Sequence, residues 1–375
     1  MKIIMIDPLI GNEYVALLCS GLSKAGADVT LIVPENREVA IPVNFSIRKW
    51  SPPKGDSSSK IIKSLKYIKY LYKVFALIRK IKPDAVHYHF FRRKSEILFY
   101  LLLRVLGVKL IYTAHNILPH EPSRIDYLLT KLVNRGARSI IVHSNYIKTK
   151  LSDTFKIDPD KIVVIPHGNF DFYIPNISMN KCESRKKLGL KGSSHILLFF
   201  GYIREYKGLD LLLEAFETAA SEDPQLELLI AGEPSSSVLL NKYQEIIKQS
   251  EVQERIITRF NYIPANEVAE YLVASDTVVL PYKNIDHSGI VHLAYSFDKP
   301  VIATKVGDFE ESIEQGKSGF ILENNNAKCL AETINEIFSC GEKLEEMGRY
   351  VKQLNNSKFS WVRIGEKTME LYARA

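Results

Sequence analysis

The sequence predicts an α/β protein of two domains, each with a parallel β-sheet covered by helices. Short apolar runs alternate with amphipathic segments along nearly the whole chain, as expected for successive strand–helix–strand units. The length of 375 residues and the hydrophobic share of 46% suit two domains with a sizeable core better than a single domain.

The first domain opens with a strand, a helix and a second strand. Residues 2–6 (KIIMI) form an apolar run, residues 13–24 show helical spacing, and residues 29–34 (VTLIVP) form the next run. Gly26 is placed to end the helix. The opening lacks the G-x-G-x-x-G pattern, so a dinucleotide fingerprint is not supported.

Histidines follow the later strands of this domain. A single such histidine is more often structural than catalytic, but the carboxyl edge of a parallel sheet is where ligands bind. Their order along the chain does not fit a zinc site with local ligand spacing. The four apolar runs that carry them are 84–91 (His87, His89), 109–116 (His115), 139–144 (His143) and 161–168 (His167).

Residues 60–82 form a basic helical segment with an apolar and tyrosine-rich face. This pattern favours an anionic membrane surface. The alternative is a helix docked on its own sheet with a lysine edge in water, and nucleic acid is a weaker interpretation because no binding motif accompanies the charge. The lysines expected to face the membrane are Lys60, Lys63, Lys66, Lys69 and Lys73.

Charge, apolar runs and cysteine content indicate where in the cell the protein acts and what kind of partner it has. The whole chain has a net charge of +7: residues 1–175 carry an excess of basic residues, and the remainder carries a smaller excess of acidic ones. An anionic partner is therefore expected for the first half. No run is long and apolar enough for a transmembrane helix, and the start shows no signal-peptide pattern. Four scattered cysteines fit a reducing cytoplasm. We expect a cytoplasmic protein able to lie on the inner face of the membrane.

The second domain is expected to begin within the polar segment 171–194. Residues 195–208 (HILLFFGYIREYKG) predict a strand and a loop before a helix, with Arg204 and Lys207 where the loop meets that helix. Two cations at a helix start suit a diphosphate. A solvated loop with two charges is an equal alternative.

Residues 280–320 predict strand, turn, helix, strand and turn. Asp286 and Ser288 are candidate N-caps, and Gly289 leaves backbone N–H groups open to a close approach. Such a helix start binds anions, because the free N–H groups and the positive end of the dipole point outward together. An ordinary β-α-β unit without a ligand is the alternative.

Taken in order, these motifs resemble glycosyltransferase family 4, the group 1 glycosyltransferases. The resemblance covers nearly the whole chain: IPHGNFDFY, the G-x-x-x-x-x-K-G loop at Gly201–Gly208, AGEP, and PVIATKVGDFEESIEQGKSGFIL. It implies the GT-B fold, two Rossmann-like domains facing across a cleft. The expected boundaries are 1–172 for the acceptor domain, 173–355 for the nucleotide-sugar domain, and 356–375 for a C-terminal helix crossing back to the first domain.

One departure from the family pattern concerns two glutamates. The family commonly carries Glu-x7-Glu, and those positions hold Ile285 and Leu293 here, as in a branch with a Ser-Gly pair. The second glutamate usually grips the nucleotide ribose, so the identity of the nucleotide stays open. Asp286 is the nearest acid to the first position, and Glu311 lies downstream.

The resemblance implies a hexosyltransferase that moves a sugar from a UDP- or GDP-sugar to a lipid-linked or saccharide acceptor, with retention of the anomeric configuration, in the synthesis of a surface polysaccharide. No DxD cluster occurs, so a metal-independent enzyme without a cofactor and without nucleic acid is expected. The implied roles are catalytic for His115, Arg204 and Lys207, donor-binding for Gly201, Glu233, Asp286, Ser288, Gly289, Ile290 and Glu311, and acceptor-binding for Asn116, His120 and Glu121.

Two other functions fit the sequence. A sugar-nucleotide epimerase would use the same donor site without an acceptor. A non-catalytic GT-B scaffold would fit the absence of both family glutamates, although Arg204, Lys207 and the Ser288–Gly289 pair oppose it.

Overall fold

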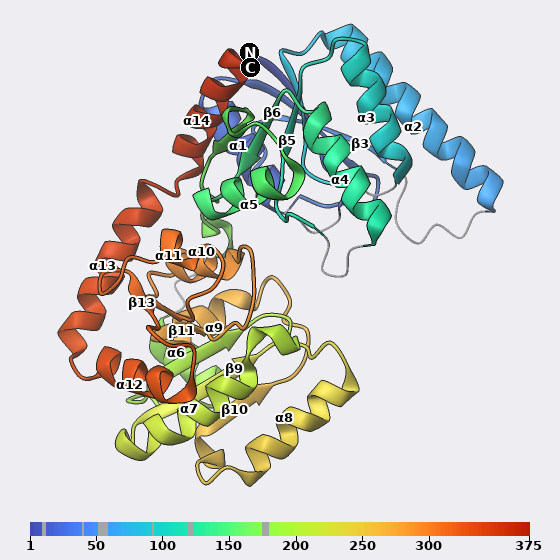
Figure 1. Cartoon of the computed structure of the whole chain (residues 1–375). Coiled ribbons are helices and arrows are strands. Elements are labelled where there is room, and N and C mark those ends of the chain that lie inside the picture. The colour runs from blue at the N-terminus through green and yellow to red at the C-terminus, as the bar shows by residue number, and fades with distance from the viewer. Residues whose placement is uncertain (10–12, 40, 52–58, 92–93, 119–122, 175–179) are drawn as a thin grey trace. The chain divides into compact units, whose positions relative to one another are not determined.

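The computed structural model describes residues 1–9, 13–39, 41–51, 59–91, 94–118, 123–174 and 180–375 (Figure 1). These residues form two compact units: unit 1 is Met1–Gly168 with Lys358–Ala375, and unit 2 is Asn169–Ser357. Each unit contains one parallel sheet with helices, which confirms the predicted α/β class.

Unit 1 has seven described strands in the order β3-β2-β1-β4-β5-β6-β7, and every pairing is parallel. The strands are β1 (Lys2–Ile6), β2 (Asp28–Pro34), β3 (Ser46–Ser51), β4 (Ala85–Tyr88), β5 (Leu110–Thr113), β6 (Ser139–Val142) and β7 (Ile162–Val164). The helices are α1 (Glu13–Lys24), α2 (Lys60–Ile81), α3 (Lys94–Val105), α4 (Arg124–Gly136), α5 (Asn145–Phe155) and α14 (Trp361–Arg374).

The two faces of this sheet carry different helices. One buried cluster joins α2, α3 and α4 to strand residues such as Ile4, Val86 and Leu110. On the opposite face α14 packs against α1, where an ideal Cβ on Gly365 would lie 2.5 Å from the backbone of Gly21 (Figure 1). Only glycine permits this approach, so the last helix of the chain completes the fold of the first unit.

Unit 2 has six described strands in the order β10-β9-β8-β11-β12-β13, again all parallel. They are β8 (His195–Phe200), β9 (Leu226–Ala231), β10 (Ile256–Arg259), β11 (Thr277–Leu280), β12 (Val301–Ala303) and β13 (Gly319–Ile321). The helices are α6 (Lys181–Leu188), α7 (Leu209–Glu222), α8 (Ser237–Gln249), α9 (Val268–Ala274), α10 (Gly289–Ser296), α11 (Phe309–Ser312), α12 (Ala327–Phe338) and α13 (Gly341–Asn356).

The polar segment 171–194 contains α6, which the sequence interpretation did not identify. Its Arg185 is buried and donates to a carboxylate oxygen of Asp276 at 2.8 Å and to the carbonyl of Ala274 at 3.0 Å. The same carboxylate oxygen also accepts from the amide of Ile196, at 2.7 Å. This buried polar network fixes α6 beside the sheet, because polar groups this deep need partners.

Among the described residues, no helix combines the length and the apolar character that crossing a bilayer requires.

Candidate active site

The loop after β8 folds back onto the end of the sheet in unit 2. Gly201 has φ of +99°, and an ideal Cβ there would lie 3.2 Å from Nζ of Lys207. Gly208 has φ of +67°, and an ideal Cβ there would lie 1.9 Å from the carbonyl oxygen of Pro281. The positive φ favours glycine at both positions, and at Gly208 the close approach of the Pro281 backbone also requires it, so the two glycines of the G-x-x-x-x-x-K-G motif are explained by backbone geometry.

Lys207 lies at the end of the short helical turn Glu205–Lys207 and is buried. Its ammonium group lies 5.5 Å from the centroid of the Tyr282 ring. It forms no ion pair with the described residues. Burial, and secondly the charge of Arg204, lower the pKa of Lys207 to about 8. A buried cation of this kind favours an anionic ligand.

The start of α10 lies beside this lysine. The hydroxyl of Ser288 accepts from the amide of Ile290 at 3.4 Å, so Ser288 is the N-cap as the sequence indicates. The side chain of Ile290 lies 3.6 Å from the ideal Cβ position of Gly201, and the ring of Phe170 lies 3.5 Å from that of Gly289. The structure thus brings the first turn of a helix and a buried ammonium group to the same glycine, Gly201, an arrangement that favours an anion.

A cavity of about 270 Å³ adjoins Gly201. Its lining includes Tyr173, Tyr202, Tyr262 and the exposed Glu233. Aromatic rings with a few polar groups are the usual lining of a small-molecule site. The guanidinium of Arg204 lies 5.2 Å from the centroid of the Tyr202 ring, so the second predicted cation stands at the edge of the same region.

A histidine–aspartate pair supports the loop that leads into α10. His287 Nδ1 lies 2.7 Å from an oxygen of Asp308, and the two side chains are 9% and 2% exposed. The amide of Asp308 also donates to the carbonyl of Asp286 at 3.2 Å. Sequence reasoning missed this pair, although His287 lies between two residues that it had selected.

The acidic candidates take different places. Asp286 lies in the loop before α10 and Glu311 lies on α11, both half-buried. Leu293 is 6% exposed and belongs to the core of unit 2. No carboxylate takes the position of the second family glutamate on α10.

In unit 1, histidines from four strand ends gather around the ring of Tyr14. The centroid of this ring lies 4.7 Å from that of His115, 4.8 Å from that of His167 and 5.3 Å from that of His143. Because the parallel strands end at one edge, residues far apart in sequence meet there, as the sequence predicted.

Three of these histidines form a directed chain. Nδ1 of His143 donates to the carbonyl of Ile165 at 3.1 Å. In the neutral ring its Nε2 then accepts from Nδ1 of His115 at 3.4 Å, and Nε2 of His115 accepts from Nδ1 of His89 at 3.2 Å. Burial holds the pKa of His89 far below its ordinary value, so this ring is neutral. The chain fixes the tautomer of His115, whose ring also stacks on Phe90.

His87 has a structural role. It lies within β4, and its nitrogens lie 2.6 Å from the hydroxyl of Tyr372 and 2.7 Å from that of Thr113. Burial lowers the pKa of His87 to about 3. The neutral ring therefore ties α14 to the sheet of unit 1.

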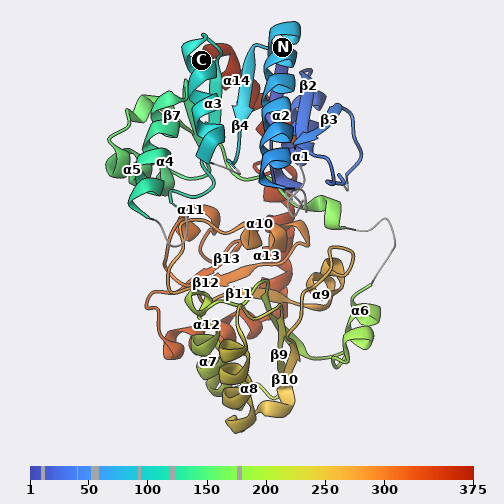
Figure 2. The ribbon, with the colours of Figure 1, turned by 90° about the vertical axis from the view of Figure 1, so that its right-hand side faces the viewer.

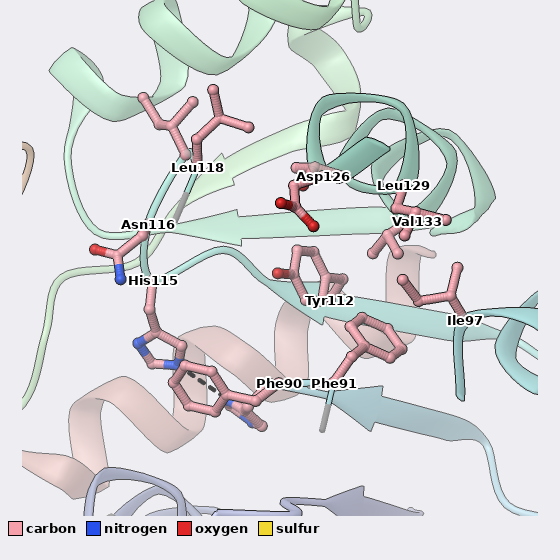
Figure 3. A pocket seen from close by; sticks show the side chains of 13 residues that line it. Phe90, Phe91, Ile97, Tyr112, His115, Asn116, Leu118, Asp126, Leu129 and Val133 are labelled. Atoms are coloured by element: carbon pink, nitrogen blue, oxygen red, sulfur yellow. Dashed lines mark hydrogen bonds between the residues drawn. The ribbon is translucent and has the colours of Figure 1, made fainter. Parts of the chain in front are cut away.

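The structure describes some of the other residues predicted to bind the acceptor or the membrane in unit 1. His115 and Asn116 line one side of a cavity of about 350 Å³ (Figure 3). His120 and Glu121 lie outside the described residues, as does the side chain of Lys60. On α2 the side chains of Lys66, Lys69 and Lys73 are exposed, and that of Lys63 is half-buried.

Comparisons with known proteins identify the family. The model "Glycosyl transferases group 1" matches residues 180–354, and "Glycosyltransferase Family 4" matches residues 11–168. D-inositol 3-phosphate glycosyltransferase of Corynebacterium diphtheriae is 22% identical over 386 aligned positions, covering 97% of this chain and 89% of that protein.

Solved structures share the fold. Sucrose-phosphate synthase of Thermosynechococcus elongatus has a TM-score of 0.75 at 18% identity, covering 100% of this chain and 98% of the other. HepE of Anabaena, in complex with UDP-glucose, has a TM-score of 0.74 at 17% identity, covering 100% of both chains.

The two parallel-sheet units and the matched models define a glycosyltransferase of the GT-B fold. Within that class the chain belongs to the group 1 glycosyltransferases of family 4, which confirms the resemblance drawn from its motifs.

Proposed function

We propose that this glycosyltransferase moves a hexosyl group from a UDP- or GDP-sugar to a hydroxyl group of a lipid-linked or saccharide acceptor, with retention of the anomeric configuration. The buried ammonium of Lys207, beside Gly201 and the start of α10, is the observation that carries the donor assignment. A nucleoside diphosphate supplies the anion that this group favours, and the related HepE was solved with UDP-glucose.

The chemistry requires charge stabilisation at the leaving group. The bond from C1 of the sugar to the diphosphate oxygen breaks, a bond from C1 to the acceptor oxygen forms, and the acceptor proton passes to the leaving diphosphate. Lys207, the fork of Arg204 and the amides of Ser288, Gly289 and Ile290 stabilise the rising negative charge. No protein nucleophile is required for this route.

The remaining donor contacts come from the rim of the site. Glu233, at the cavity with three tyrosines, would contact the nucleoside. Asp286 and Glu311 are the acids nearest to the loop before α10 and would orient the sugar. The His287–Asp308 pair would hold that loop in place.

The acceptor side is assigned to unit 1. His115, held in one tautomer by His89 and His143, would contact the donor sugar, and Asn116 would contact the acceptor. The exposed lysines of α2 would place this unit on the anionic inner face of the membrane, where precursors of a surface polysaccharide are carried on lipids.

Nucleotide release from a panel of UDP-, GDP- and ADP-sugars tests this function, with and without a membrane lipid extract. We expect slow hydrolysis of one donor and a faster release when lipid is added. Arg204→Ala and Lys207→Ala should each lower turnover by about 10²-fold or more, the scale of losing one charge-stabilising donor.

The alternatives give different results in the same assay. Free epimer formed without an acceptor would indicate an epimerase. An intact protein that binds none of the nucleotides would indicate a scaffold. Wild-type turnover in both the Arg204 and the Lys207 variants would contradict the assigned roles.

A further inference from the structure

The cavity beside His115 has a polar side and an apolar side. It lies between α3 and α4, at the ends of β4 and β5, with a volume of about 350 Å³. Figure 3 shows His115 and Asn116 on one side and Ile97, Leu129 and Val133, beside the carboxylate of Asp126, on the opposite and mainly apolar side. A volume of this size suits a small molecule or part of a larger one. The apolar side has no evident use for a sugar alone.

The outer face of α3 continues this apolar character into solvent. Leu98, Leu102 and Val105 follow helical spacing on α3, Leu106 comes directly after the helix, and all four are exposed, Leu98 at 69% and Val105 at 82%. Leu98 directly follows Ile97, which lines the cavity. Isolated exposed leucines are normal, but a continuous stripe on one helix indicates an interaction surface.

The same arrangement occurs on α4. Leu129 and Val133 line the cavity beside the polar Asp126 and Thr130, and the exposed apolar stripe is shifted by one residue to Ile125, Leu128 and Leu132. One residue is about 100° around a helix, so the two stripes are adjacent faces of α4. Apolar surface therefore extends from the cavity lining to the exterior on both helices.

The charge of the neighbouring helix α2 indicates what the exposed apolar stripes contact. Figures 1 and 2 show α2 beside α3, and both pack in the same buried cluster. α2 contains no acidic residue, and it exposes Ile61, Leu65 and Ile68 next to lysines. Exposed apolar side chains among lysines fit an anionic bilayer, where the chains enter the interface and the ammonium groups meet lipid phosphates.

We propose that the cavity between α3 and α4 binds the apolar chain of the acceptor lipid where that chain leaves the bilayer. The sugar end of the acceptor then lies toward His115 and Asn116, and the alkyl or prenyl chain lies against Ile97, Leu129 and Val133. This assignment rests on the proposed function, because it names the acceptor class of that reaction. It makes chain length a determinant of acceptor affinity.

Binding of dodecyl phosphate below its micelle concentration tests this assignment without turnover, with butyl phosphate as the comparison. Each buried methylene tightens binding about fourfold, so three buried methylenes give about 60-fold. Isothermal titration calorimetry on the wild-type chain should show at least that preference for the dodecyl compound. Equal affinities for the two phosphates would overturn the proposal.

Two adjacent leucines on α4 provide matched variants. Leu129→Trp fills the cavity and should weaken dodecyl phosphate binding by about tenfold or more, the loss of at least two methylene contacts. Leu128→Trp adds the same side chain on the exposed stripe and should bind dodecyl phosphate as the wild type does. Circular dichroism and thermal unfolding check that both variants fold. Equal losses in both variants would contradict a role for the cavity.

Binding to vesicles of equal parts phosphatidylcholine and phosphatidylglycerol distinguishes the role of the exposed stripes from that of the cavity. Leu128→Glu should lose vesicle binding, whereas Leu129→Trp should keep it. If light scattering instead showed a dimer that Leu128→Glu dissociates, the exposed stripes would be a protein interface and the proposal would fail.

Nucleotide binding, measured separately, decides the proposed function. If the protein binds UDP but binds the two alkyl phosphates equally well, the lipid-binding role of the cavity is refuted and the proposed glycosyl transfer is not. If the protein prefers dodecyl phosphate but binds no nucleotide, the proposed glycosyl transfer is refuted and the lipid-binding role of the cavity is not.

Discussion

The pH dependence of donor use tests the role of Lys207. Burial, and then the charge of Arg204, lower the pKa of Lys207 from 10.5 to about 8. The free enzyme therefore loses this proton in a pH range where an ordinary lysine keeps it. Because a diphosphate is stabilised by the charged form, kcat/KM for the donor should fall as the pH rises through about 8.

The magnitude follows from the fraction protonated. With a pKa of about 8, roughly 90% of Lys207 carries its proton at pH 7 and roughly 10% at pH 9, so kcat/KM should fall about tenfold. Release of the nucleotide at low donor concentration measures this parameter. In Lys207→Arg the guanidinium keeps its charge over the whole range, so the profile should be flat even where the rate is lower.

Binding of UDP gives a second measurement. At pH 9, formation of the UDP complex should take up as much as about 0.9 proton, because the bound diphosphate raises the pKa of the Lys207 ammonium group. Calorimetry in two buffers with different ionisation enthalpies detects this uptake. Parallel pH profiles for the wild type and Lys207→Arg, or UDP binding without proton uptake, would refute the assignment of Lys207.

Three further predictions concern stability, the histidine chain and metals. Asp276→Ala leaves the buried guanidinium of Arg185 without its carboxylate, so the free energy of unfolding in urea should fall by about 3–5 kcal/mol; a loss below about 1 kcal/mol would contradict this. His143→Ala removes the partner that fixes the tautomer of His115 and should lower kcat about tenfold with an unchanged dissociation constant for UDP; a weaker UDP affinity would point to a folding defect. Turnover should persist in EDTA, and its abolition would indicate a required metal.

Much of the local structure followed from the sequence. Helical spacing placed the helix Glu13–Lys24 within its observed bounds, and Ser288 capped α10 as its side chain predicted. The G-x-x-x-x-x-K-G loop was found because glycines with positive φ and a tight approach leave a fixed pattern. α6 was missed because its eight residues are mostly polar and show no apolar stripe.

The candidate site was predictable in part. Histidines at the ends of parallel strands were expected to lie at one edge, since topology alone brings strand ends together. The order of hydrogen bonds among His143, His115 and His89 was not, because it depends on ring orientations within the packed edge. The pairing of His287 with Asp308 joins the loop before α10 to the loop after β12, and no local spacing signals it.

The sequence by itself determined the class of fold, and it predicted residues able to hold an anion. These properties are local: periodicity, capping and the freedom of glycine act within a few residues. Tertiary structure decided which of those residues became chemically special. Lys207 has an unusual pKa because distant segments bury it, and the cavity between α3 and α4 exists because two helices pack over two strand ends. Burial and cavity shape are set by the whole chain, so they emerge only when it has folded.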